Sequence, residues 1–304
     1  TGQYKGYTFY TAPLPSAGGI ALINTFHILS HFDLPERSSA NRTHLLAEAF
    51  RRSYRDRLLV GDPDFMQTPV DQLISHSHAK AWAKTISLEK ATPSITLIQP
   101  TPMTQTKLTE KEHTTHFSVI DQEGNIVSAT LSLNLPFGSG MQIPETGIFL
   151  NNQLDDFSIG SSANAYGLVD HPHNHLAPKK RPLSSMTPTI IEGHQQVSIL
   201  GTPGGSRIPT MVILSSLALM EGLSVKEAAA LPRFHHQWMP DHIEYEATAL
   251  SESHQQQLSE KGHTLTKTNR NYGNMQIIRW NQKTNIMEVA SDPRGDGAAL
   301  RTSQ

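Results

Sequence analysis

Two adjacent threonines, Thr114 and Thr115, lie where a polar stretch ends and an alternating pattern begins. Residues 105–113 are typical of a solvated connector, whereas residues 116–121 alternate between apolar and polar side chains, as in a half-buried strand. If the chain is cut between His113 and Thr114, the new α-amine of Thr114 lies beside its own hydroxyl and can activate it as a nucleophile. An ordinary strand that begins with two threonines is the alternative, because threonine is common in strands.

The element that must position this threonine is a predicted β-hairpin. Residues 116–121 and 126–134 form its two strands around a short glycine-containing turn. Antiparallel pairing puts Ser132 and Asn134 one strand away from the Thr114 end. A hydroxyl at that place can orient a nucleophile by a hydrogen bond, and a side-chain amide can receive an amino group of a substrate.

A glycine-rich turn over residues 201–206 links a predicted strand to an apolar helix over residues 208–220. Amide N–H groups at a helix N-terminus favour an anion, so a phosphate site is one interpretation. The turn lacks the full GxGxxG or GxxxxGK[ST] pattern of nucleotide sites. We therefore favour an oxyanion hole, in which Gly204 and Gly205 direct N–H groups at a tetrahedral intermediate.

Two more polar clusters follow predicted strands or precede them. Gln153 and Asp156 come after a predicted strand at residues 147–150, and taken alone they fit a loop with Asx turns. A carboxylate such as Asp156 is also what a buried cation requires. Ser184 and Ser185 precede a predicted hairpin, and two hydroxyls with adjacent amides can bind a carboxylate.

The composition of the 304 residues permits a large hydrophobic core and excludes several kinds of chemistry. The net charge is −2, so nothing indicates nucleic acid or an anionic membrane as a partner. Without cysteine there is no disulfide, thiolate metal site or cysteine nucleophile. No apolar run approaches the roughly 20 residues of a membrane-spanning helix. Because the first residue is Thr1 and not Met, we expect a fragment or a processed product.

The remaining pattern mixes helices and strands without strict βαβ alternation, which indicates the α+β class. Helices are predicted by apolar periodicity and capping residues over residues 20–29, 41–58, 70–84, 208–220 and 250–261, with a short one opened by a capping box at Ser224 and Glu227. Residues 158–178, rich in Gly, Ser, Asn and His, are typical of a mobile covering loop.

Two groups of basic side chains are interpreted as surface features. The first is a set of four arginines that we expect on a solvated helix face, with ion pairs to Glu48 and Asp56. They are Arg51, Arg52, Arg55 and Arg57. The second is a set of alternating loop histidines, His171, His173 and His175. Without an Asp, Glu or Cys partner at ligand spacing, we expect these histidines to be solvent-exposed and to bind no metal.

Several blocks in order carry a resemblance to a known family. They are TTHFSVIDQEGNIVSATLSLNLPFGSG, GIFLNNQLDDF, KRPLSSMTPTI, LGTPGGSRIPT, LPRFHHQWMPD and ASDPRGDG. From about Tyr4 to Arg294 the chain resembles the γ-glutamyltransferase family (γ-glutamyltranspeptidase, or glutathione hydrolase), whose members are N-terminal-nucleophile hydrolases. Residues 1–113 resemble the C-terminal portion of the large subunit, ending in a processing linker. Residues 114–304 resemble the small, catalytic subunit, with Thr114 as its N-terminal nucleophile.

The resemblance implies an αββα sandwich, with stacked sheets between helical layers. It implies self-cleavage at His113–Thr114 into a heterodimer of large and small subunits. Thr114 then attacks the γ-glutamyl amide of glutathione or a related compound and transfers the acyl group to water, amino acids or peptides. No metal or organic cofactor is needed, and the location implied is periplasmic or extracellular.

The resemblance also implies roles for single residues. Ser132 stands where the family usually has a supporting Thr, and it lacks the methyl group that restricts rotation. The other matching positions are Asn134, Gln153 and Asp156 for the substrate α-ammonium, Ser184 and Ser185 for the α-carboxylate, Gly204 and Gly205 for the oxyanion, and Tyr166 as the gate of a lid. The family also uses a large-subunit arginine for the α-carboxylate, and no residue of this chain matches it.

Two alternatives remain open at the level of the sequence. One is a related acylase that acts on another amide, such as a glutaryl-type substrate. The other is a truncated, non-catalytic homologue that serves as a structural or binding module. The set Asn134, Gln153, Asp156 and the serine pair favours γ-glutamyl recognition over the first, and Thr114 with its glycine turn disfavours the second.

Overall fold

The structure is a computed structural model that describes residues 1–97, 114–159, 164 and 166–300. His113, the expected residue before the cut, lies outside the described residues. Helices and strands alternate without a βαβ pattern, and the strands of the main sheet are all antiparallel. The predicted α+β class is therefore confirmed.

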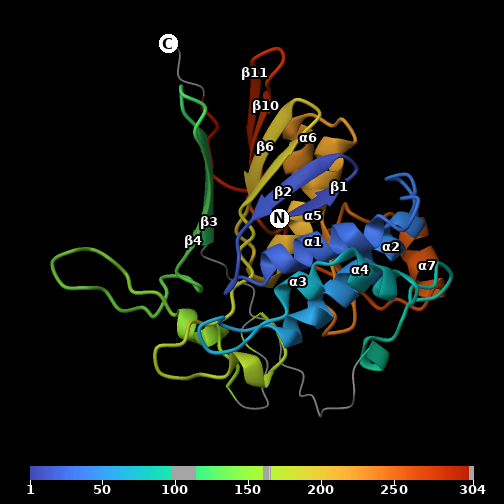
Figure 1. The fold of residues 1–304 in the computed structure, drawn as a ribbon, viewed down its shortest axis with the longest axis horizontal. Helices are drawn as coiled ribbons and strands as arrows, with labels where there is room; N and C mark the ends of the chain where they lie inside the picture. Colours follow the sequence, from blue (N-terminus) through green and yellow to red (C-terminus); the bar gives the residue numbers. More distant parts are fainter. Residues whose placement is uncertain (98–113, 160–163, 165, 301–304) are drawn as a thin grey trace.

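A six-stranded antiparallel sheet forms the middle of the molecule (Figure 1). In spatial order its strands are β1 (Gly2–Tyr4), β2 (Tyr7–Thr11), β5 (Thr189–Gly193), β6 (Gln196–Gly201), β10 (Gln276–Asn281) and β11 (Ile286–Ser291). β2 pairs directly with β5, so strands from before and after the 98–113 segment share one hydrogen-bonded sheet. A cut at that segment would leave this pairing in place.

Helices cover one face of this sheet. Among them are α1 (Gly18–Leu29), α2 (Ala40–Arg55), α5 (Ile208–Met220), α6 (Val225–Ala230) and α7 (Glu252–Glu260). Every residue of α1 is buried, because it lies between the sheet and the neighbouring helices. The capping box predicted for α6 is present, with Ser224 and Glu227 each bonding the other's backbone N–H.

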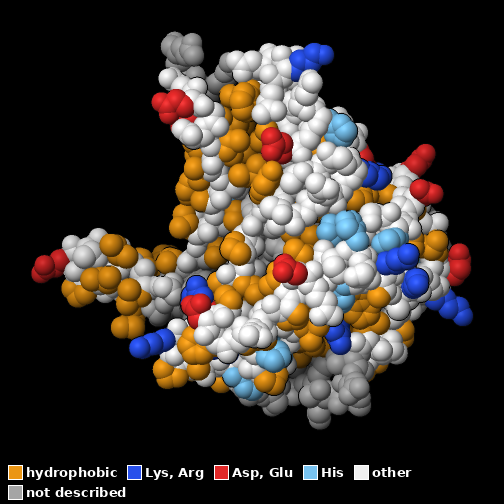
Figure 2. Space-filling view, in the orientation of Figure 1, with side chains coloured by type: hydrophobic (Ala, Val, Ile, Leu, Met, Phe, Trp, Pro, Cys, Tyr) orange, Lys and Arg blue, Asp and Glu red, His pale blue; other side chains and the backbone are white. Residues whose placement is uncertain are grey.

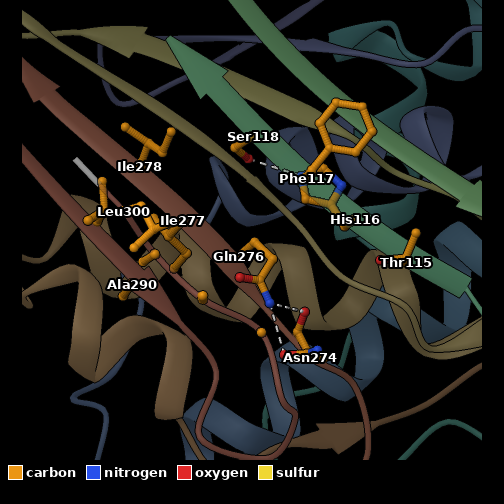
Figure 3. A pocket seen from close by; sticks show the side chains of 14 residues that line it. Thr115, His116, Phe117, Ser118, Asn274, Gln276, Ile277, Ile278, Ala290 and Leu300 are labelled. Atoms are coloured by element: carbon orange, nitrogen blue, oxygen red, sulfur yellow. Dashed lines mark hydrogen bonds between the residues drawn. The ribbon is translucent and has the colours of Figure 1, made fainter. Parts of the chain in front are cut away.

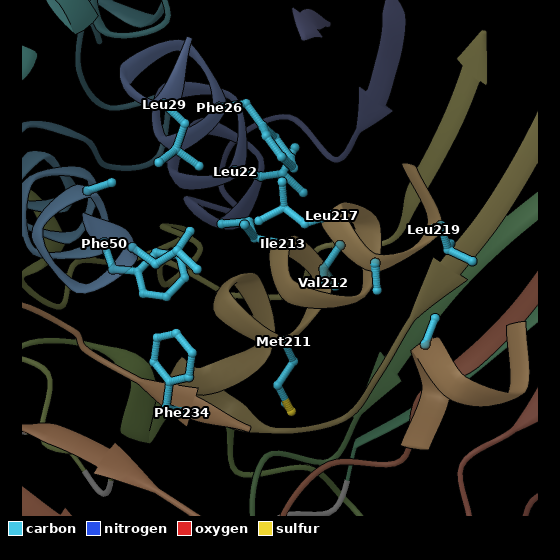
Figure 4. Close-up of a cluster of buried hydrophobic side chains, with 14 of the residues drawn as sticks. Leu22, Phe26, Leu29, Phe50, Met211, Val212, Ile213, Leu217, Leu219 and Phe234 are labelled. Carbon is cyan, nitrogen blue, oxygen red and sulfur yellow. The ribbon is translucent and has the colours of Figure 1, made fainter. Parts of the chain in front are cut away.

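The main hydrophobic core lies between the sheet and these helices (Figure 4). Phe9 of β2 stacks on Phe26 of α1 with ring centroids 4.5 Å apart. Phe50 of α2 packs near Phe234, and Met211 of α5 is fully buried in the same cluster. Burial of this many large apolar side chains is the main stabilising term of the fold.

The predicted hairpin is present as β3 (Thr114–Ile120) and β4 (Ile126–Ser132), paired antiparallel. It lies against the face of the main sheet opposite the helices (Figure 1). The approach is close, because a Cβ at Gly201 of β6 would lie 2.3 Å from the His116 ring. The layers among the described residues therefore run helix, sheet, sheet.

The outer face of the hairpin is apolar and exposed. Phe117, Val119, Val127 and Leu131 project from it, each with 43 to 57% of its surface accessible. Figure 2 shows hydrophobic side chains gathered along this part of the molecule. Among the described residues no helix covers this face, so the outer helical layer of the expected αββα sandwich is not supplied by them.

The smaller elements include two departures from the sequence prediction. The helix expected over residues 70–84 is divided into α3 (Val70–Leu73) and α4 (His76–Ala83), because the Ser75 hydroxyl accepts the His78 N–H and caps a new helix. The strand expected at residues 147–150 is absent apart from one bridge at Phe149, because the chain turns tightly just before it, with positive φ at Glu145 and Gly147.

The other elements are short or lie away from the sheet. They are the 3₁₀ turns η1 (Asp56–Leu59), η2 (Ser94–Leu97), η3 (Gln153–Asp156), η4 (Pro172–Asn174) and η5 (Gly205–Arg207), and a sheet of β7 (Phe234–His235), β8 (Ile243–Tyr245) and β9 (Leu265–Lys267). No described helix has both the length and the apolar character needed to cross a membrane.

The arginine prediction is half right. Ion pairs to Glu48 and Asp56 are present, but the face is not solvated, because Arg51 and Arg52 are 1% and 0% exposed. The Glu48 carboxylate accepts both guanidinium groups, at 3.2 Å from Arg51 and 2.7 Å from Arg52. A buried carboxylate with two cations can be stable only when its oxygens are fully bonded, and Thr92 supplies the remaining donors.

The exposure predicted for the loop histidines is wrong at one position. His173 and His175 are exposed, but His171 is 5% exposed, and burial lowers its pKa to about 3. The loop turns inward because the Ser158 hydroxyl accepts the His171 N–H at 3.2 Å. His171 is therefore a neutral, buried side chain.

Candidate active site

The predicted nucleophile begins β3 and faces its predicted partner. Thr114 and Ser132 are directly opposite in the β3–β4 ladder, and their hydroxyl oxygens are 2.9 Å apart. The Ser132 oxygen also accepts the Asn134 N–H at 2.8 Å. This second bond fixes the Ser132 rotamer, so the missing methyl group of threonine is partly compensated.

Asn134 is held in a conformation that few side chains adopt. Its φ is +70°, a region in which asparagine is enriched, and it is 2% exposed. Its amide donates to the Asn152 carbonyl at 3.2 Å and approaches Asp155 Oδ2 at 3.4 Å. The backbone carbonyl of Asn134 accepts a hydrogen bond from the Tyr166 hydroxyl at 3.0 Å. Asn134 thus joins the end of β4, the η3 turn and the loop that contains Tyr166.

The η3 turn presents one orphaned acceptor and one perturbed acid. Gln153 Oε1 is buried and finds no hydrogen-bond donor among the described residues. Burial raises the pKa of Asp156 to about 7; the Arg57 charge opposes this rise and the neighbouring Asp155 adds to it. An unfilled acceptor beside a desolvated carboxylate is suited to a ligand that carries N–H donors.

The two serines lie on an extended segment beside α1. Ser184 pairs with Ser16 in an isolated bridge, which fixes the backbone. The Ser184 hydroxyl accepts the Met186 N–H at 3.1 Å, and the Ser185 hydroxyl accepts an Arg57 N–H at 3.3 Å. Among the described residues neither hydroxyl hydrogen has an acceptor inside the protein, so both can be donated to an anion in the pocket.

The glycine turn has the unusual backbone that glycine permits. Gly204 and Gly205 have φ of +151° and +53°, and the 3₁₀ turn η5 leads from them into α5. A Cβ at Gly205 would lie 2.3 Å from the Tyr166 ring, and one at Gly204 would lie 2.1 Å from Met211. Glycine is therefore required at both positions by packing as well as by backbone conformation.

These side chains meet in a single pocket, which we call the Thr114 pocket. It is lined by the residues Thr114, Ser132, Asn134, Gln153, Asp156, Tyr166, Leu168, Ser184, Ser185, Met186, Gly205, Ser206 and Ile208. Of the predicted site residues, only Gly204 and His113 are not in this lining: Gly204 directly precedes Gly205 in the chain, and His113 is outside the described residues. Segments up to about ninety residues apart in the chain are thus brought to one place.

Sequence reasoning missed the residues that support this pocket from below. Gln237 donates to the Tyr166 carbonyl at 3.0 Å and accepts the Ser206 hydroxyl at 2.6 Å. The Tyr54 hydroxyl donates to the Ser206 carbonyl. Tyr54 and Gln237 are buried and lie far from Ser206 in sequence, so no local spacing could have predicted these contacts.

One group in the described part of the chain has the geometry of a metal site. His44, Glu48 and His263 are buried, with ligand atoms within 4.8 Å of one another. The atoms of this cluster that face one another are already hydrogen-bonded or ion-paired, however. His44 Nε2 donates to the Ser87 carbonyl, so His44 Nδ1 accepts from His263 Nε2 at 2.7 Å. The Glu48 carboxylate is engaged by two arginines, so this cluster is a hydrogen-bonded support and not a cation site.

A second pocket opens between β3 and β10 (Figure 3). His116 and Ser118 of β3 lie on one side of it, and Gln276 and Ile277 of β10 on the other. The Gln276 amide is held by the Asn274 side chain at 2.9 Å. None of the predicted site residues lines this pocket, so it is separate from the Thr114 pocket.

Comparison with known proteins agrees with this geometry. A family model described as Gamma-glutamyltranspeptidase matches residues 1–302. The chain is 43% identical to the glutathione hydrolase proenzyme of Escherichia coli, over 81% of this chain and 43% of that protein. It is 41% identical to the glutathione hydrolase proenzyme of Pseudomonas aeruginosa, over 98% of this chain and 54% of that protein. The chain thus spans about half the length of the curated relatives it matches.

The solved structure of cephalosporin acylase from Bacillus halodurans matches 99% of this chain and 52% of its own, with a TM-score of 0.79 and 25% identity. The stacked sheets and the strand that begins at a threonine define the class of N-terminal-nucleophile hydrolases, as the sequence predicted. Within that class, the chain belongs to the γ-glutamyltranspeptidase family.

Proposed function

We propose that this chain is the working part of a γ-glutamyltransferase that is also a glutathione hydrolase. In this proposal Thr114 attacks the γ-glutamyl amide of glutathione or a related compound and passes the acyl group to water, an amino acid or a peptide. The observation that carries the proposal is the Thr114 pocket, in which the Thr114 and Ser132 hydroxyls are 2.9 Å apart and share the space with Asp156 and the serine pair.

The first step is maturation. The bond between His113 and Thr114 is broken by the chain itself, which leaves residues 1–113 as the end of the large subunit and residues 114–304 as the small subunit. The pairing of β2 with β5 supports a heterodimer that stays assembled after the cut. The cut frees the Thr114 α-amine, which then serves as the base.

Acyl transfer follows in two steps, acylation of Thr114 and its deacylation. The α-amine takes the proton of the Thr114 hydroxyl, whose oxygen attacks the γ-carbonyl carbon, and N–H groups at Gly204 and Gly205 stabilise the oxyanion. The amide nitrogen receives that proton and leaves as an amine, so Thr114 carries a γ-glutamyl ester. Water or an acceptor amine then attacks the ester carbonyl carbon, and the α-amine takes a proton from the attacking molecule and returns this proton to the Thr114 oxygen. Glutamate or a new γ-glutamyl amide is released.

Recognition of the glutamyl group follows from the charges in the pocket. Asp156, with Gln153 and Asn134, is suited to the α-ammonium, because it is a desolvated carboxylate in the same pocket as an orphaned amide oxygen. Ser184 and Ser185 are suited to the α-carboxylate, because both hydroxyl hydrogens are available. Tyr166 lies across the glycine turn, and we assign it the role of a gate.

The proposal includes a setting for the enzyme. Its small-molecule partners are glutathione, other γ-glutamyl compounds and amino acid or peptide acceptors, and it needs neither nucleic acid nor a cofactor. We place it in the periplasm or outside the cell, as the family resemblance implies.

A related acylase is the second candidate, favoured by the likeness to the cephalosporin acylase. The two candidates differ in the α-ammonium of the substrate. A glutaryl group lacks this ammonium, so it would leave Asp156 without a partner on the substrate. Turnover of γ-glutamyl-p-nitroanilide and of glutaryl-p-nitroanilide by the full-length protein separates them. We expect the γ-glutamyl compound to be preferred by at least a hundredfold in kcat/KM, since a site built to bond a polar group strongly rejects an analogue that lacks it. Preference for the glutaryl compound would overturn the proposed function.

A further inference from the structure

Arg57 lies in η1, directly after α2, and its guanidinium group points to the segment that carries the serine pair. Nη1 donates to the Ser184 carbonyl at 3.0 Å and to the Ser185 hydroxyl at 3.3 Å. Nη2 donates to the Leu183 carbonyl at 3.3 Å. One rigid planar group thus bonds three consecutive residues, which fixes the path of the backbone and the rotamer of Ser185.

The same arginine shares a cavity with Asp156 and interacts with its carboxylate through charge. Arg57 and Asp156 line one small cavity that adjoins the Thr114 pocket, together with Asn174 and His171. The other titratable groups that face this region are Tyr54 and Asp155. Burial raises the pKa of Tyr54 and lowers that of His171, so both are neutral near pH 7. Among these groups Arg57 supplies the positive charge and the two aspartates the negative charge.

We propose that Arg57 is a positioning residue of the Thr114 pocket, which holds the Ser184–Ser185 segment and places a positive charge beside Asp156. Through these contacts Arg57 positions the serine pair and keeps Asp156 ionised, without touching the substrate. The inference rests on the proposed function, because it assigns Asp156 and the serine pair to the two charged groups of a γ-glutamyl substrate.

The electrostatics support this assignment. Burial raises the pKa of Asp156 and the Asp155 charge raises it further, whereas the Arg57 charge lowers it. Without Arg57 the carboxyl would be protonated over more of the neutral range, and a neutral carboxyl binds an ammonium group weakly. Burial lowers the pKa of Arg57 and the Asp156 charge raises it, so each group favours the charged form of the other.

Arg55 offers a matched control two residues earlier in the chain. It donates to the Leu97 carbonyl and pairs with Asp56, and it does not line the Thr114 pocket. The test compares Arg57→Met, Arg57→Lys and Arg55→Met with the wild type, all as full-length protein. The measurement is kcat and KM for γ-glutamyl-p-nitroanilide from about pH 5 to pH 9, with circular dichroism as the check of folding.

In the wild type we expect kcat/KM to fall as the pH drops through the titration of Asp156. Arg57→Met should move this acidic limb to higher pH by about one unit or more, the usual size of a neighbouring-charge effect. It should raise KM more than it lowers kcat. Arg57→Lys keeps the charge and should leave the limb near its wild-type position, while KM still rises because an ammonium group lacks the planar fork. Arg55→Met should change neither.

Three results are informative. Wild-type turnover with an unmoved limb in Arg57→Met, or with an equal shift in Arg55→Met, overturns the role of Arg57 and leaves the proposed function standing. No wild-type turnover of the γ-glutamyl compound overturns the proposed function, and this inference with it. If Arg57→Met does not fold, Arg57→Lys decides, because an unchanged KM in that variant contradicts the positioning role.

Discussion

Ser132 is the side chain that contacts the predicted nucleophile, and it stands where the family resemblance implies a threonine. Its hydroxyl lies 2.9 Å from that of Thr114 and is fixed by the Asn134 N–H. A serine can rotate where a threonine is restricted, so its orientation depends on this single backbone contact. The preorganisation of the nucleophile is therefore carried by the β4 strand end and not by the rotamer alone.

The Ser132 contact predicts a graded effect on turnover. Ser132→Ala should lower kcat about tenfold, the usual contribution of one hydrogen bond of about 1 to 1.5 kcal/mol, with little change in KM. Ser132→Thr should keep kcat or raise it, because the added methyl group restricts rotation. Steady-state kinetics of the processed enzyme measures both effects. Ser128→Ala is the control, since Ser128 lies on the same face of β4 but contacts only backbone carbonyls at 3.4 Å or more. Equal loss in Ser128→Ala would contradict a specific role of Ser132.

The sequence could predict the residues whose chemistry is visible in short motifs. Thr114, Ser132 and Gly205 follow from a strand junction, a hairpin register and a glycine turn. Arg57 could not be predicted in its role, because its acceptors are 126 to 128 residues away and the local pattern resembles a surface face of a helix. The supporting role of Gln237 could not be predicted either, because its partners Tyr166 and Ser206 are also distant in sequence.

The glycine turn shows how an element can serve the site and the packing together. Gly205 begins η5 and faces the Tyr166 ring. Gln237 bonds both the Tyr166 carbonyl and the Ser206 hydroxyl, and so ties the two segments together. The Tyr54 hydroxyl bonds the Ser206 carbonyl from α2. The turn is thus held by three separate segments before any substrate binds, as an oxyanion site requires.

Gly205→Ala should lower kcat by about two to three orders of magnitude, the usual loss when an oxyanion donor is displaced. The physical reason is that the new Cβ would lie 2.3 Å from the Tyr166 ring at a φ of +53°. The control is Gly222→Ala at the end of α5, where φ is +87° and nothing lies within 4 Å of the added Cβ. It should cost about 1 kcal/mol of stability through backbone strain and leave kcat unchanged. Comparable activity of the two variants would contradict the oxyanion role.

The elements themselves were well predicted where periodicity was strong. α5 has the predicted bounds, and the strands of the hairpin predicted at residues 189–192 and 196–200 each extend one residue further at the C-terminal end. The failures have local causes. The helix predicted over residues 70–84 is broken by a cap at Ser75. The segment around Phe149 turns too tightly to form the predicted strand. Burial of Arg51 and Arg52 follows from a tertiary partner segment at residues 85–94 that helical spacing does not reveal.

At the scale of the whole molecule, many histidines are buried in a neutral form. Burial lowers the pKa of His116, His235 and His263 to about 4, and that of His171 and His236 to about 3. In the unfolded chain these groups titrate near 6.5. Between pH 6.5 and 4 the unfolded state therefore binds more protons than the folded state, and stability is lost as the pH falls.

We accordingly predict that the free energy of unfolding falls between pH 7 and pH 5, by up to about 1.4 kcal/mol per pH unit for each proton taken up. Asp156 acts in the opposite direction, because its folded pKa of about 7 lies above the unfolded value. It is one group against five. Asp62, with a pKa lowered to about 2, contributes only below about pH 4. Urea denaturation at several pH values measures the slope, and a flat or rising stability from pH 7 to pH 5 would contradict the buried-histidine account.

The central claim is that Thr114 is made an N-terminal nucleophile by a cut within one continuous fold. The first strands and the last strands share the main sheet, so a cut in the 98–113 segment can occur without separating the parts. The measurement that tests the claim most directly is the intact mass of the full-length protein under denaturing conditions, before and after incubation at neutral pH, for the wild type and for Thr114→Ala. We predict two wild-type pieces that meet between His113 and Thr114, and one unbroken Thr114→Ala chain without turnover. An unbroken wild-type chain, or a Thr114→Ala chain cut at the same bond, would contradict it.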